Sequence, residues 1–134
     1  MAAPSVEDKI ELDRLIDQYA HAVFEKDADL WGAVWADRED CHWDLGGMKM
    51  DGKATIVSTW IKAVANFGWI WHVVPNKWFE VDGDTATGVC YLREEVTRAD
   101  GARGTLTARY HDQYVRTPQG WRVLSRRLEI LDRS

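Results

Sequence analysis

One histidine stands in the middle of an apolar, strand-like run, and it is the first candidate for chemistry. His72 is flanked by Ile70, Trp71, Val73 and Val74, and the packing of a strand gives no reason for an imidazole there. A histidine titrates near neutral pH, so in apolar surroundings it can serve as a general base. The alternative is a structural histidine that is hydrogen-bonded to a neighbouring helix.

Two tyrosines are candidate hydrogen-bond donors to a reacting oxygen. Tyr19 lies on the apolar face of a predicted helix, and Tyr110 lies on a predicted strand. A phenol can polarise a carbonyl group or stabilise a developing oxyanion. Strand alternation places Tyr110 on the same face as Asp112, and Arg109 and His111 on the opposite face, where an ion pair or a subunit contact is expected.

A carboxylate directly follows a tryptophan on a short predicted strand. Asp44 comes after Trp43 and before the pair Gly46-Gly47. A carboxyl group beside an indole can have a raised pKa and act as an acid or base, or it can pair with Arg109. Capping of the glycine turn is the equally open alternative.

Tryptophan is unusually frequent, with eight in 134 residues. A core of this size does not require so many indoles, so we expect some of them to line a cavity or an interface. Trp31, Trp35 and Trp43, in the helical half and on the short strand, are candidates to hold a substrate. For Trp60 we prefer an ordinary place in the core.

Alternation along the strand that carries His72 divides its neighbours between two faces. If His72 faces inward, Ile70 and Val74 do so too and are predicted to contact the substrate. Trp69 and Trp71 then face outward. Exposed indoles mark an interface, so we expect a twofold homodimer or a higher homo-oligomer, formed sheet to sheet.

The elements that must position these residues change in type halfway along the chain. Apolar residues recur at helical spacing over residues 5–26, 27–35 and 52–67, with Ser5 and Asp27 or Asp29 as N-caps. From residue 69 the period becomes two, and Asp-Gly turns separate long strands. These strands are predicted over residues 69–81, 85–97, 104–116 and 121–131, after a short one at 41–45. The pattern predicts one α+β domain, residues 1–134, with helices on one face of a bent sheet.

Composition excludes several classes of protein. The formal net charge is −5 and no block of Lys and Arg is present, which argues against binding to nucleic acid. No apolar run approaches the ~20 residues of a membrane span. The two cysteines, Cys41 and Cys90, are too few for a disulfide framework, and we expect a cytoplasmic protein. Cys90 is predicted to be a small, buried side chain on the substrate-binding side of its strand.

Metal and cofactor sites have no sequence support. The histidines show none of the spacings typical of metal ligands, and no Cys-x-x-Cys pair occurs. Glycine-rich phosphate loops and the Gly-x-Ser-x-Gly motif are missing as well. We therefore expect neither a metal nor a cofactor.

A set of short motifs, in this order and spacing, resembles the SnoaL-like polyketide-cyclase family of the nuclear-transport-factor-2-like superfamily. The resemblance covers residues 7–131. The motifs are Tyr19-Ala20, residues 26–29, Trp43-Asp44, residues 71–76, residues 81–86, residues 108–112 and residues 120–122. It implies a cone, in which a strongly curved, mostly antiparallel sheet wraps around three N-terminal helices and encloses an internal pocket.

The resemblance also implies roles for particular residues. His72 matches the histidine that scytalone dehydratase and hexachlorocyclohexane dehydrochlorinase use on the equivalent strand. His21 falls where the dehydrochlorinase has an aspartate, and a neutral imidazole cannot orient His72 as a carboxylate does. Asp17, one turn before His21, could hold that imidazole, and a solvated polar face is the alternative.

These observations lead to one main hypothesis and several alternatives. We expect a cofactor-independent lyase or dehydratase that acts on a hydrophobic aromatic or polycyclic small molecule. Within the same class, an isomerase, a cyclase or a carbon–carbon lyase that releases formaldehyde remains open. The other classes are a non-catalytic binding module and a small structural subunit of a ring-hydroxylating dioxygenase. Fold alone does not decide among them.

Overall fold

Three helices lie in the first half of the chain, as the apolar spacing predicts. The computed structural model describes residues 2–134. Ser5 caps the first helix by accepting a hydrogen bond from the backbone of Asp8, and Asp27 caps the second in the same way. Lys26 takes a left-handed conformation and ends the first helix. The helices are α1 (Val6–Glu25), α2 (Ala28–Gly32) and α3 (Lys53–Val64).

Six strands form a single sheet, and the predicted meander makes up most of it. The order across the sheet is β2-β1-β6-β5-β4-β3, and every neighbouring pair is antiparallel except β1 with β6. The strands are β1 (His42–Leu45), β2 (Met48–Asp51), β3 (Phe67–Asp82), β4 (Thr85–Arg98), β5 (Arg103–Thr117) and β6 (Gly120–Arg133). Two features were not predicted from the sequence, namely strand β2 and the parallel pairing of β1 with β6.

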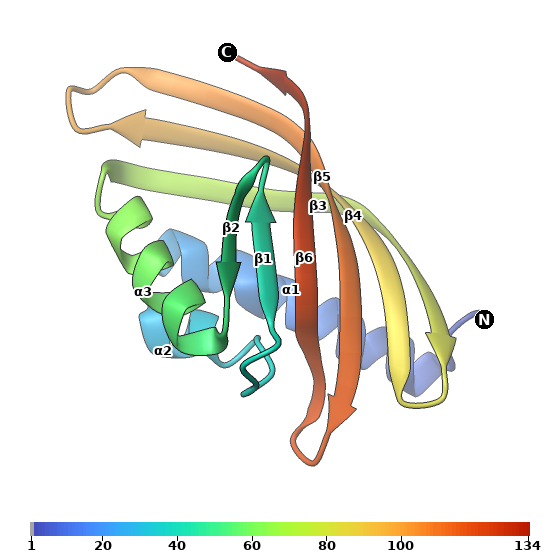
Figure 1. Ribbon diagram of the computed structural model, residues 1–134. Coiled ribbons are helices and arrows are strands. Elements are labelled where there is room, and N and C mark those ends of the chain that lie inside the picture. Colours follow the sequence, from blue (N-terminus) through green and yellow to red (C-terminus); the bar gives the residue numbers. More distant parts are fainter. Residues whose placement is uncertain (1) are drawn as a thin grey trace.

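The sheet curves around the helices, which lie together on one of its faces (Figure 1). We call this the inner face and the opposite one the outer face. The inner face and the apolar sides of the helices form one continuous core. The predicted α+β cone is therefore confirmed. Among residues 2–134, no helix is both long and apolar enough to cross a membrane.

Irregularities in strand pairing decide which side chains reach the inner face, and two of them matter for the site. In β3 the register shifts between Val73 and Asn76, and in β6 it shifts opposite the step from Gln113 to Tyr114. An extra residue reverses the parity of every side chain beyond it. In β6, Trp121 and Val123 face inward at odd-numbered positions. Beyond the extra residue the inward positions are even-numbered, so Arg126 faces inward.

Candidate active site

His72 lies on the inner face of β3 and is almost completely buried. Its Nδ1 is 2.8 Å from Oε2 of Glu94, its direct partner across the β3–β4 ladder. A carboxylate only accepts hydrogen bonds, so Nδ1 carries a proton, and in the neutral form of the ring Nε2 has the free lone pair. That Nε2 is buried and has no hydrogen-bond partner in residues 2–134. His72 is thus held in the tautomer that a general base needs.

Two phenols and a guanidinium group lie beside this imidazole. The ring of Tyr19, on α1, is 5.3 Å from the His72 ring between centroids, and its hydroxyl is 3.5 Å from the hydroxyl of Tyr110. The guanidinium carbon of Arg126 lies 4.5 Å from the Tyr19 ring and 4.1 Å from the Tyr110 ring. Arg126 is therefore held between two aromatic faces.

A buried carboxylate fixes the other side of the guanidinium. Asp112 accepts two hydrogen bonds from Arg126, from Nε and Nη2, each of 2.8 Å. Asp112 also accepts hydrogen bonds from the hydroxyl of Tyr114 and, at 3.4 Å, from the thiol of Cys90. The remaining Nη1 of Arg126 is buried and has no partner among the described residues. Arg126 can therefore still donate hydrogen bonds from Nη1 to an oxygen atom in this interior.

The surroundings set the charge that each of these groups carries. Burial raises the pKa of Tyr19, and it holds the pKa of Tyr110 well above its ordinary value. Burial alone lowers the pKa of Arg126, but the carboxylate of Asp112 outweighs this effect and leaves it well above the ordinary value. The two phenols therefore remain protonated donors, and Arg126 remains a cation.

Tryptophans make up the wall next to Tyr19. The rings of Trp31 and Trp60 are stacked 4.5 Å apart, and Trp31 also contacts Trp35 and Trp43 at centroid distances of 5.7 and 5.3 Å. The indole N–H groups of Trp31, Trp35 and Trp43 are buried without a partner in residues 2–134. Because buried indole N–H groups usually find an acceptor, this cluster fits a ligand that brings oxygen atoms.

The structure gathers most of the predicted site residues into this interior. His72, Tyr19, Tyr110 and the three predicted indoles lie in it, and Ile70 is buried on the same face of β3. Cys90 is buried too, but it belongs to the hydrogen-bonded group around Asp112, and burial raises its pKa to about 12, so it remains a thiol. Val74 packs only partly against the core, because the register of β3 shifts next to it.

Two predicted catalytic residues lie outside the buried group around Arg126. Asp44 alternates with the buried Trp43 and so faces outward, where its carboxylate accepts a hydrogen bond from the backbone of Gly47. It caps the turn and does not pair with Arg109. His21 is exposed on α1, and together with His72 it lines a hollow between α1 and β3, away from the buried group around Arg126.

Three residues of the site were not proposed from the sequence. Glu94 supplies the carboxylate that His21 could not, and Asp112 and Arg126 form the buried ion pair. Alternation along β4 and β5 did carry a signal for the two acids, since each interrupts an inward-facing apolar series. Arg126 had no such signal, because only the irregular pairing in β6 turns it inward. Residues 2–134 contain no group of three or more His, Cys, Asp or Glu placed to hold a metal ion.

Comparison with known proteins identifies the domain family and the fold. The family model of the SnoaL-like domain matches residues 4–127. An uncharacterized protein of Mycobacterium tuberculosis is 29% identical over 132 residues, covering 94% of this chain and 87% of its own length.

Two solved structures share the architecture. A proposed aromatic ring hydroxylase from Novosphingobium aromaticivorans superimposes with a TM-score of 0.90 at 28% identity, covering 98% of this chain and 94% of the other. A proposed scytalone dehydratase from the same organism has a TM-score of 0.88 at 16% identity, covering 96% and 87%. At that identity the second similarity shows the common fold alone.

Proposed function

Because the chain belongs to the SnoaL-like domain family, we propose that it is a cofactor-independent lyase, and more specifically a dehydratase, of a hydrophobic aromatic ring compound. One observation carries the proposal. Nδ1 of His72 is bonded to a carboxylate at 2.8 Å while its Nε2 is buried and unpartnered. A neighbour of the same fold is described as a proposed scytalone dehydratase, which is consistent with this choice of reaction.

The residues divide the reaction between them. Nε2 of His72 takes a proton from a carbon next to a carbonyl group, and the electron pair left behind forms a carbon–carbon double bond as a neighbouring hydroxyl leaves. The imidazolium returns its proton to that hydroxyl, so the products are the alkene and one water molecule. Glu94 stabilises the imidazolium. Arg126 Nη1 and the phenols of Tyr19 and Tyr110 donate hydrogen bonds to the oxygen on which negative charge develops.

The test compares two histidines that both contact a glutamate but lie on opposite faces of the sheet. His111 on β5 faces outward, and its Nε2 is 2.7 Å from Oε1 of Glu129. The substrate is a β-hydroxy ketone fused to an aromatic ring, and the absorbance of the conjugated product is followed. We expect His72→Gln to lower kcat by about 10²–10⁴, the usual worth of a positioned base, with little change in melting temperature.

The control His111→Gln should leave kcat unchanged. Glu94→Gln should lower kcat by about tenfold or more, because the amide no longer stabilises the imidazolium. If His72→Gln melts earlier but turns over at the parent rate per folded molecule, His72 is structural and the proposal is wrong.

A second function is favoured by the 28% identical neighbour described as a proposed aromatic ring hydroxylase. On that alternative the chain is a non-catalytic subunit of a larger hydroxylase. Such a subunit would not convert ring compounds by itself, so the parent chain would show no turnover of the test substrate. Turnover by the parent chain therefore separates the two functions.

A further inference from the structure

We propose that the ligand of this site is a ring compound with one or two rings and a single negative charge, such as a carboxylate. It would bind in a hollow at the open end of the sheet. Only the orientation of the ligand rests on the proposed function. The hollow ends at Glu94, the partner of His72, so the reacting end of the ligand would point there. Its charge and size are argued from the hollow itself.

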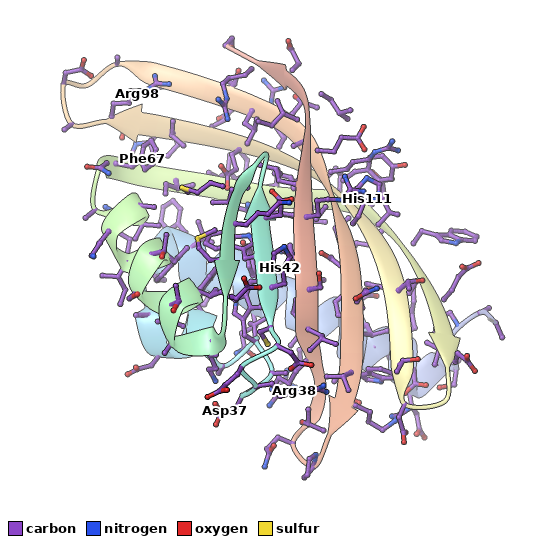
Figure 2. The ribbon with its side chains drawn as sticks, in the orientation of Figure 1. Asp37, Arg38, His42, Phe67, Arg98 and His111 are labelled. Atoms are coloured by element: carbon purple, nitrogen blue, oxygen red, sulfur yellow. The ribbon has the colours of Figure 1, made fainter. Side chains whose placement is uncertain are left out.

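The hollow has a volume of about 310 Å³ and lies on the inner face, where β3, β4, β5 and β6 come to the same end. Phe67 at the start of β3 and Arg98 at the end of β4 mark this end (Figure 2). Phe67, Val96 and Leu106 give it apolar walls, while Arg98 and Arg133 supply positive charge. A pocket of this size suits one or two rings and is small for a polycyclic ligand.

One row of residues across the sheet connects this charge to the proposed base. His72 pairs with Glu94, Glu94 with Leu106, and Leu106 with Arg133, on four successive strands. Neighbouring strands are about 4.8 Å apart, so the backbone of Arg133 lies roughly 10 Å from that of Glu94. A ring resting on Leu106 can therefore direct its acid group to Arg133 and its other end towards the dyad of His72 and Glu94.

The two arginines are available for such a contact. Neither Arg98 nor Arg133 forms an ion pair with another described residue, although the chain carries a formal net charge of −5. Some other arginines of the sheet, such as Arg109 and Arg126, do have a carboxylate partner. The lone acid of the hollow, Glu94, is already bonded to His72.

Arg98 is also held in place. It donates a hydrogen bond of 3.2 Å from Nη1 to the backbone oxygen of Arg103. Its guanidinium group lies over Gly104, where an added Cβ would come within 2.7 Å of Nη2. Because Gly104 has no side chain, the guanidinium group of Arg98 fits at the rim of the hollow. A guanidinium group can bind a carboxylate through two parallel hydrogen bonds.

The test measures the binding of 2-naphthoate and of its neutral analogue 2-naphthamide by titration calorimetry. We expect the acid to bind the parent protein about tenfold more tightly than the amide, since charge-assisted hydrogen bonds exceed neutral ones. Arg98→Gln and Arg133→Gln should each weaken the acid about three- to tenfold and leave the amide unchanged. The control is Arg127→Gln, at an exposed arginine on the outer face of β6, which should alter neither ligand.

Two outcomes overturn the inference: equal affinity for acid and amide, or an equal loss in the Arg127→Gln control. A failure of the proposed function is distinguishable. In that case His72→Gln has no effect on any rate, while the preference for the acid and its dependence on Arg98 remain.

Discussion

Strands β5 and β6 carry two arginine–carboxylate pairs of the same kind on opposite faces. On the inner face Asp112 pairs with Arg126, and on the outer face Arg109 pairs with Glu129. Both pairs are direct partners across the ladder, and both have two hydrogen bonds, of 2.8 and 2.8 Å inside and of 2.9 and 3.2 Å outside. What differs is exposure to water.

Because of this difference, the buried pair can position neighbouring polar groups, whereas the partly exposed pair only occupies the surface. Burying both ions of Arg126 and Asp112 has a large desolvation cost, which their attraction repays only when every other polar atom is satisfied. Nη1 of Arg126 is not satisfied. The inner pair is therefore poor evidence for stability and good evidence for a binding site, whereas the outer pair is partly exposed and weakened by solvent and salt.

Removing one partner of the inner pair should have the largest effect. Asp112→Asn keeps the shape of the side chain but leaves the buried guanidinium of Arg126 without a counter-charge. We expect a loss of about 3–5 kcal/mol in the free energy of unfolding, measured by urea denaturation at pH 7.

The matched control removes both charges. Asp112→Leu combined with Arg126→Met should recover most of the lost stability, because no buried charge is left unpaired. It should also lower kcat, since the Nη1 donor to the developing negative charge is gone. If the double variant were no more stable than Asp112→Asn, desolvation would not be the cause of the loss.

The outer face can be tested through its exposed indoles. Trp71 is 52% exposed and lies on the outer face of β3, as the alternation predicts. We still expect a sheet-to-sheet homodimer at micromolar concentration, and Trp71→Lys should raise its dissociation constant by about tenfold or more, as for a central interface residue. Sedimentation velocity at several concentrations measures this. A parent protein that remains monomeric at these concentrations would contradict the prediction.

The two faces of the sheet also show which features could be predicted from the sequence. Helix caps, the change of apolar period and the Asp-Gly turns are local signals, and they located the three helices and the long strands. Alternation along β3 also divided the neighbours of His72 correctly between the two faces, given that His72 faces inward. Arg126 could not be placed this way, because its orientation depends on one irregular step in the pairing of β5 with β6.

The carboxylate partner of His72 illustrates the second limit. The family resemblance directed attention to the position of His21 on the first helix, while Glu94 occupies the neighbouring strand. Which residues of two strands face each other depends on register, and register is set by the whole hairpin. Alternation alone could have indicated that Glu94 faces inward, but it could not have indicated that its partner is His72.

The smallest effect is expected at the outer pair, and it should depend on pH. Hydrogen bonds from Arg109, and next from His111, lower the pKa of Glu129 from 4.5 to about 2. A lowered pKa means that the folded state favours the ionised form, so this stabilisation is present above pH 4.5 and disappears as the pH falls towards 2.

Glu129→Gln should therefore have a slightly lower urea midpoint than the parent at pH 6. The difference should shrink between pH 4.5 and 3, and 0.5 M salt should reduce it at pH 6. Asp132→Asn, at an exposed carboxylate on the same strand, is the control and should show no such trend. A midpoint shift at pH 6 as large as that of Asp112→Asn would show that the two faces of the sheet do not differ as argued.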